Sequence, residues 1–181
     1  SNSRANVEVK TGANPTVRSN TIRNGKTNGV AVHSKGLGQL DENDIFGNAM
    51  ANVEIAEGGD PTIRKNRIHK GASVGVFVRD TGRGTLTSND IFENAGCGAI
   101  VKSGGSPELN RNRIFANKAS GCVVCDGGKG TFEGNHIFRN TLSGVDVRSA
   151  GDPTFRYTLS VSPSLPLCLP STNGSAIQPL G

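Results

Sequence analysis

The stretch NRIHKGASVGVFVRDTGRGTLTSNDI, residues 66–91, decides the fold because it holds one complete sequence repeat and the start of the next. It opens on Asn66-Arg-Ile68 and reaches Asn89-Asp-Ile91 after 23 residues. The same Asn-x-Ile pair recurs at this interval without insertion, and its asparagines are Asn20, Asn43, Asn66, Asn89, Asn112 and Asn135. A fixed period of this length is typical of a repeat architecture.

Apolar residues within each repeat are spaced as in β-strands. Two positions one residue apart hold Val, Ile, Ala or Cys in every repeat, as in Val53 and Ile55, and another apolar position lies three residues before each Asn. A spacing of two in segments bounded by Gly, Pro, Asn and Ser indicates short strands separated by turns. A single coil cannot bury its apolar face, but stacked coils can. The sequence therefore predicts an all-β fold, a single-stranded right-handed parallel β-helix of about seven 23-residue coils over residues 1–156.

The Asn column has two structural explanations. Asn tolerates the left-handed backbone region that a tight corner needs, and its amide can bond to the Asn of the next coil to form a ladder. A second corner alternates between Pro and Gly-x-Gly with a period of 46 residues, as at Pro61 and Gly82-Arg-Gly84.

The repeat pattern fails after Phe155, where Thr158 and Ser160 replace the expected Asn and Ile. We predict an irregular, mostly disordered tail rich in Ser, Pro and Leu over residues 157–181. Two alternatives remain: the tail caps the open end of the helix, or it is a splice-variant end that replaces further coils.

Composition and charge narrow the classes of function. The chain has 181 residues, 25 Gly and a net charge of +5, with one Tyr and no Trp, so neither a nucleic-acid platform nor a membrane span is predicted. Four Cys do not make a disulfide framework, which favours a reducing compartment, cytoplasmic and/or nuclear. We interpret the chain, which begins with Ser1 in mid-repeat, as a fragment of a longer protein.

No set of residues predicts catalysis, a metal or a cofactor. Asp44, Arg67, Asp90 and Arg113 occupy one column, and we interpret them as a salt-bridge ladder rather than a catalytic carboxylate pair. Three carboxylates never follow one another in successive coils, as a polysaccharide-cleaving site would require. Cys122-x-x-Cys125 lacks a second half-site for zinc.

One column carries mostly positive charge, and we call its members the basic stripe: Lys10, His33, Arg79, Lys102 and Arg148. The stripe could bind an acidic protein segment, or it could simply be a solvated face. Phe46, Phe92, Phe115 and Phe138 share another column, which predicts stacked packing or, if exposed, a binding edge.

The sequence of the repeat resembles the β-helix repeats of F-box-only proteins. The motifs that carry the resemblance are residues 14–22 (NPTVRSNTI), 60–69 (DPTIRKNRIH), 82–84 (GRG), 89–94 (NDIFEN) and 43–50 (NDIFGNAM). The resemblance covers residues 1 to 156 and implies a pectin-lyase-like fold with carbohydrate-binding and sugar-hydrolase-like repeats. Family members are substrate receptors of cullin-based (SCF) ubiquitin ligases, and the F-box that docks the ligase adaptor is missing here. The family's repeats offer no catalytic residue to carry over.

These observations predict a non-catalytic, monomeric substrate-recognition fragment of such a receptor, whose partner is a protein substrate for ubiquitination. Two alternatives stand beside it: a carbohydrate-binding or polysaccharide-degrading β-helix, and a purely structural scaffold.

Overall fold

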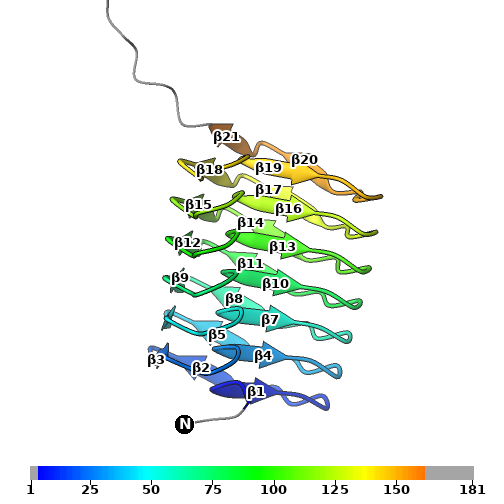
Figure 1. Ribbon diagram of the computed structural model, residues 1–181. Coiled ribbons are helices and arrows are strands. Elements are labelled where there is room, and N and C mark those ends of the chain that lie inside the picture. The colour runs from blue at the N-terminus through cyan, green and yellow to red at the C-terminus, as the bar shows by residue number, and fades with distance from the viewer. Residues whose placement is uncertain (1–3, 162–181) are drawn as a thin grey trace, which may run out of the picture.

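The computed structural model describes residues 4–161, and in this part of the chain every regular element is a β-strand of three residues. Figure 1 shows the strands stacked coil upon coil into an elongated solenoid. Each coil contributes one strand to each of three parallel sheets, and each sheet has seven strands. The predicted right-handed parallel β-helix of about seven coils is confirmed.

We name the sheets A, B and C in the order in which the chain enters them. Sheet A contains β1 (Val7–Val9), β4 (Val30–Val32), β7 (Val53–Ile55), β10 (Val76–Val78), β13 (Ala99–Val101), β16 (Cys122–Val124) and β19 (Val145–Val147). Sheet B contains β2 (Thr16–Arg18), β5 (Gln39–Asp41), β8 (Thr62–Arg64), β11 (Thr85–Thr87), β14 (Glu108–Asn110), β17 (Thr131–Glu133) and β20 (Thr154–Arg156). Sheet C contains β3 (Thr21–Arg23), β6 (Asp44–Phe46), β9 (Arg67–His69), β12 (Asp90–Phe92), β15 (Arg113–Phe115), β18 (His136–Phe138) and β21 (Leu159–Val161).

The register places each residue directly over its equivalent 23 positions away. Ile68 pairs with Ile45 on one side and with Ile91 on the other, and all three side chains have no exposed surface. Burial therefore runs along the axis as columns of identical or similar side chains, as expected for a solenoid.

The sheets differ in which strand position points outward. On sheets B and C the middle residue of each strand is buried except in the end strands β2, β20 and β21, whereas on most of sheet A the first and third residues are buried and the middle one reaches the surface, as Glu54 does in β7. Sheet A therefore presents one outward column within its strands, and sheets B and C present two each.

The asparagine ladder forms at the corner between sheets B and C. Asn43 donates from its backbone N–H and from Nδ2 to Asn66 Oδ1, at 2.8 and 2.9 Å, and from Nδ2 to the carbonyl oxygen of Val17 at 2.9 Å. The left-handed residue of this corner precedes the Asn, as with Glu42 at φ 56° and Lys65 at φ 53°. The interpretation that Asn itself takes the positive φ was therefore wrong: its amide, not its backbone freedom, sets the preference.

A second buried amide ladder joins the end of sheet C to the start of sheet A, and sequence analysis missed it. In each coil, two positions face each other at this corner, and one of them supplies the amide as Asn while the other is Gly. In most coils the Asn follows sheet C, as Asn94 does opposite Gly75, but in the first and third coils it precedes sheet A, as Asn6 opposite Gly25 and Asn52 opposite Gly71. The bonded series is Asn6, Asn48, Asn52, Asn94, Asn117 and Asn140.

The helix continues past the predicted boundary at residue 156. Strand β21 pairs with β18, and Leu159 N donates to the carbonyl oxygen of Asn135 at 2.8 Å. Thr158, in the ladder position, donates from Oγ1 to the carbonyl oxygen of Phe132 at 2.9 Å and so takes over one bond of the missing Asn amide. The rest of the predicted tail, residues 162–181, lies outside the described residues.

Candidate functional site

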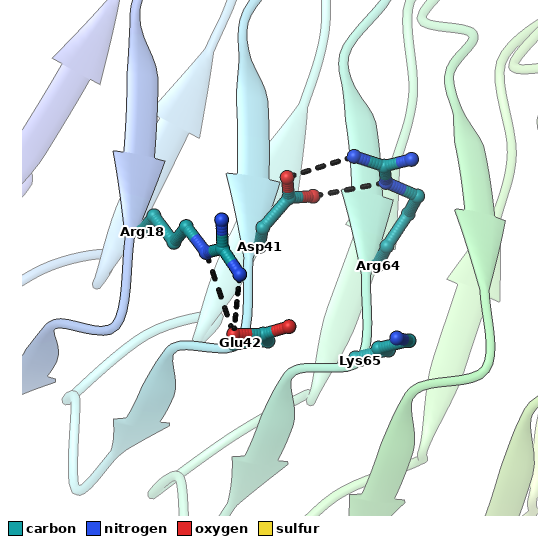
Figure 2. A pocket seen from close by; sticks show the side chains of 5 residues that line it. All are labelled: Arg18, Asp41, Glu42, Arg64 and Lys65. Atoms are coloured by element: carbon teal, nitrogen blue, oxygen red, sulfur yellow. Dashed lines mark hydrogen bonds and ion pairs between the residues drawn. The ribbon is translucent and has the colours of Figure 1, made fainter.

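Among the described residues, the first coils form two surface depressions in which charged side chains gather. The smaller, of about 230 Å³, lies where sheet B turns into sheet C and is lined by Arg18, Asp41, Glu42, Arg64 and Lys65 (Figure 2). Arg64 binds Asp41 through two hydrogen bonds of 3.0 and 2.8 Å, and Arg18 binds Glu42 at 3.1 Å. This depression is the smaller of the two and its lining contains no apolar residue, so it is a weak candidate for binding an organic ligand.

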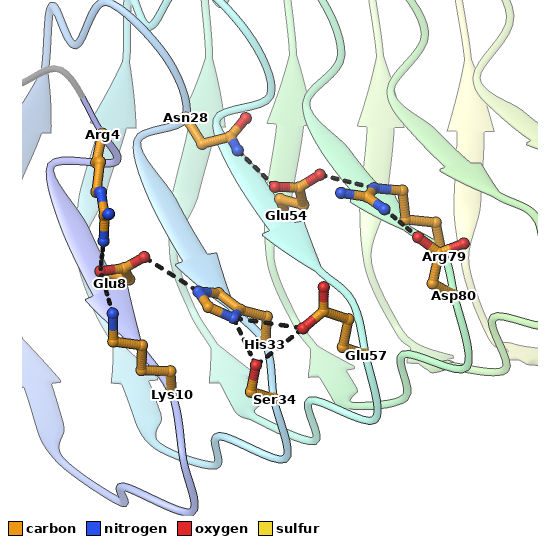
Figure 3. Close-up of polar contacts among 10 residues, drawn as sticks. All are labelled: Arg4, Glu8, Lys10, Asn28, His33, Ser34, Glu54, Glu57, Arg79 and Asp80. Carbon is orange, nitrogen blue, oxygen red and sulfur yellow. Dashed lines mark hydrogen bonds and ion pairs between the residues drawn. The ribbon is translucent and has the colours of Figure 1, made fainter.

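The larger charged depression, of about 320 Å³, lies on the outer face of sheet A over its first coils. Its lining contains Glu8, His33, Glu54, Glu57 and Arg79, which come from four successive coils. Figure 3 shows these side chains linked across neighbouring strands by polar contacts. Because the register is fixed, residues far apart in sequence meet here at the strand spacing of about 4.8 Å.

His33 is the centre of the first half of this cluster. Its Nε2 lies 3.1 Å from Glu8 Oε1, and its Nδ1 lies 2.9 Å from Ser34 Oγ and 3.7 Å from Glu57 Oε2 (Figure 3). The Ser34 hydroxyl donates to Glu57 at 2.8 Å. The imidazole is thus held between carboxylates of the coils before and after its own, with about a quarter of its side chain (27%) exposed.

Glu54 and Arg79 form the second half. Arg79 Nε donates to Glu54 Oε1 at 2.9 Å, and its guanidinium also binds the adjacent Asp80. Asn28 Nδ2 donates to Glu54 Oε2 at 2.6 Å. Both oxygens of this carboxylate are fixed, and the guanidinium is left with outward N–H groups.

The electrostatics of the cluster favour the ionised form of Glu8. The hydrogen bonds from His33 and from Lys10 Nζ hold the pKa of Glu8 below its usual range. The cluster therefore offers charged acceptors beside charged donors, and these nearly cancel in net charge.

The basic stripe follows the strands of sheet A as one column, but its charges are paired within the molecule. Lys10 binds Glu8 at 3.1 Å, and Arg148 lies 3.7 Å from Asp146. Lys102 Nζ lies 5.7 Å from the ring centroid of Phe77. The carboxylates that pair with the stripe occupy the outward middle position of the strands, between the two Val columns. Reading that column in the sequence would have found them.

The next three coils have apolar residues in the outward column of this face. Phe77, Ile100 and Val123 follow Glu54 in the outward column, and Val123 has only 4% of its surface exposed. Cys122 is buried in the core, and burial raises the pKa of its thiol to about 12. Between residues 4 and 161 no three His, Cys, Asp or Glu side chains are grouped to hold a metal ion. The same part of the chain has no helix long and apolar enough to cross a membrane.

Comparison with known proteins identifies the family. The family described as "right handed beta helix region" matches residues 5–158. The chain belongs to this right-handed β-helix family. The match covers nearly all of the described coils and supports none of the F-box features, so membership among the F-box-only proteins stays a prediction.

Two solved structures show the same fold. The crystal structure of a periplasmic alginate epimerase, AlgG, matches with a TM-score of 0.75 over 85% of this chain at 13% identity, and a single-residue mutant of that enzyme matches with a TM-score of 0.70 over 79% at 14% identity. This chain spans 41% and 38% of their lengths. A search of curated protein sequences gives no match.

Proposed function

We propose that this β-helix binds a carbohydrate chain along the outer face of sheet A and does not cleave it. The cluster around His33 and Glu54 is the main contact, and the sugar chain runs parallel to the helix axis. The observation that carries the proposal is the depression of about 320 Å³, in which fixed donors and acceptors from four coils converge.

The chemistry of the face suits a sugar polymer. Carboxylates that are already fixed, such as Glu54, accept hydrogen bonds from sugar hydroxyl groups, and the outward N–H groups of Arg79 donate to hydroxyl or carboxylate oxygens. The apolar surface of Phe77 and Ile100 lies next along the axis and can cover the C–H face of a sugar ring. Fixed polar groups beside an apolar surface are what a small-molecule site requires, because such groups need no reordering on binding.

The fold supports the same class of ligand. The solved structures of the same fold include an enzyme named for acting on alginate, a polysaccharide. The two proteins share the architecture, but their sequences are only 13% identical. The side chains of this chain therefore carry the proposal.

The cluster favours binding over turnover. A general acid needs a carboxyl group that keeps its proton near neutral pH, and glycoside cleavage uses such a group beside a second carboxylate. The pKa of Glu8 is shifted in the opposite direction, and both oxygens of Glu54 are occupied. Glu8 is therefore not prepared to donate a proton.

Calorimetric titration with alginate, polygalacturonate and a neutral glucan tests the proposal. We expect at least one polymer to bind, and we expect His33→Ala to weaken that binding about tenfold or more. His136→Ala is the matched control, because His136 lies exposed on sheet C, and it should bind as the parent does. If no polymer binds, or if both variants bind equally well, the proposal is wrong. Release of unsaturated or reducing sugars would overturn its non-catalytic part alone.

A further inference from the structure

The outer face of sheet C carries two outward columns that run along the axis. The charge column consists of the first residues of β6, β9, β12 and β15, and it alternates in sign: Asp44, Arg67, Asp90 and Arg113. The ring column consists of the third residues of β6 to β18: Phe46, His69, Phe92, Phe115 and Phe138.

The charge column is accessible and its two arginines are only loosely paired, whereas Asp44 Oδ1 also lies 2.9 Å from His69 Nε2. The side chains of Arg67 and Arg113 are 58% and 55% exposed, and each lies 3.4 Å from the Asp of the coil before it. Exposed pairs of this length contribute little by themselves, so their charges remain available to a partner.

The ring column forms a flat apolar ridge. Neighbouring rings stack with centroids 4.7 to 5.1 Å apart and planes within 15° of parallel. Their faces cover one another, so a sugar ring has no free face to stack on, and His69 within the column is buried, with 6% of its surface exposed. Arg67 and Arg113 lie over Phe92 and Phe115, at 5.6 and 5.1 Å from the ring centroids. The face therefore carries an apolar column of rings beside a column of side chains that alternate in charge.

We infer that two copies of this chain pair through the sheet C faces, with their helix axes antiparallel. A two-fold axis in the interface and parallel to the strands reverses the order of the coils but keeps each column opposite itself. With the axis between β9 and β12, Arg67 of one copy faces Asp90 of the other, and Asp44 faces Arg113. Each of the four charged side chains then faces one of opposite charge, and the two-fold symmetry generates each pair twice.

The same symmetry matches the ring column. His69 faces Phe92, Phe46 faces Phe115, and Arg23, over Phe46 in its own chain, faces Phe138 of the second copy. A slip of one coil would place Arg67 opposite Arg67 and Asp44 opposite Asp90, or Asp90 opposite Asp90 and Arg67 opposite Arg113. Alternation at the strand spacing therefore fixes the register of the dimer, as opposite charges do between interacting surfaces.

The size of the face sets the strength expected. Six strands span about 25 Å along the axis and three residues about 10 Å across it, so each copy contributes only about 250 Å², which is below the size of stable specific interfaces. We therefore expect a weak dimer that dissociates on dilution and in salt. This inference departs from the sequence-based expectation of a monomer.

Sedimentation equilibrium of the full chain tests the pairing. We expect a dimer whose dissociation constant rises about tenfold or more between about 50 and about 500 mM salt, across which the Debye length falls about threefold. Arg67→Asp alone and Asp90→Arg alone should each be monomeric, since each places two like-charged pairs at the centre. Mixed together, the two variants should form a heterodimer, because every facing pair is again opposite in charge.

Two controls separate loss of pairing from loss of fold. Circular dichroism should show the same β-sheet spectrum for both variants and the parent. Arg64→Asp, a matched reversal on sheet B at a side chain that is 51% exposed, should leave the dimer intact. A parent chain that stays monomeric at low salt, or single variants that still dimerise, would overturn the inference. So would folded variants that fail to pair on mixing.

Discussion

The second amide ladder needs one Asn and one Gly at each pair of facing positions. We therefore predict that an Asn→Gly substitution at one position, which destabilises the fold, is compensated by Gly→Asn at the facing position. Asn52 is fully buried and its side chain makes three hydrogen bonds: it accepts from Asn48 Nδ2 at 2.8 Å and donates to Asn94 Oδ1 at 2.9 Å and to the carbonyl oxygen of His69 at 3.0 Å. Asn52→Gly removes all three and leaves the Asn48 amide and the His69 carbonyl without these partners. At about 1 to 3 kcal/mol for each buried group left unsatisfied, we expect a loss of about 3 to 5 kcal/mol.

The opposite substitution should also destabilise, for a steric reason. A Cβ at Gly71 would lie 2.8 Å from Asn52 Nδ2, so Gly71→Asn overfills the site and should cost about 1 to 3 kcal/mol. The double variant, Asn52→Gly with Gly71→Asn, rebuilds the arrangement that Asn94 and Gly75 have in the next coil. We expect it to unfold within about 1 to 2 kcal/mol of the parent, so the coupling energy should be about 3 to 6 kcal/mol.

Urea unfolding of the four chains, followed by circular dichroism, measures this cycle. Unchanged denaturant slopes would show that the free energies of unfolding are comparable. A double variant as unstable as the sum of the two single variants would refute the reasoning, because the two positions would then not share one amide.

Three further predictions test the packing and the charges. Gly98→Ala places a methyl group 2.4 Å from Ile114 Cγ2 and should lower the free energy of unfolding by about 1 to 3 kcal/mol, whereas a neutral effect in urea unfolding would show that the coils separate more easily than we infer. The Cys122 thiol, with its pKa raised to about 12 by burial, should resist alkylation at pH 8 until the chain unfolds, and mass spectrometry showing rapid labelling of the native chain would contradict this. The hydrogen bonds from Arg64 lower the pKa of Asp41, so this carboxylate stabilises the fold above its unfolded pKa of about 3.9 and loses that contribution as pH falls through the lower folded value. The stability difference between the parent and Asp41→Asn should therefore shrink on acidification, and a difference that is constant from pH 7 to pH 2 would be the contrary result.

The fold was predictable because each of its determinants recurs in the sequence. The 23-residue period of Ile45, Ile68 and Ile91 fixes which residues stack, and the same period predicts the ladder of Asn43 and Asn66. A solenoid repeats one local solution, so seven copies of a weak pattern become a strong one.

The features that sequence analysis missed depend on exchanges between positions. Asn52 supplies an amide that most other coils supply from the facing position at the same corner. As a result, neither of the two sequence columns holds Asn in every repeat. Likewise the charge of the basic stripe is cancelled by Glu8 and Glu54, which lie in a different column of the same sheet. Pairing between columns follows from side-chain reach and rotamer, which a period does not encode. The end of the helix was placed too early because Thr158 supplies a bond that was expected only from Asn.

The most direct test of the carbohydrate-binding account is a map of the ligand by NMR, from the backbone amide shifts of the full chain titrated with oligosaccharides of the polymer that binds. The account predicts that the largest changes fall on sheet A around Glu8, His33, Glu54 and Arg79, and that His136 on sheet C does not respond. Changes confined to sheet B or sheet C, or no change at saturating sugar, would contradict it.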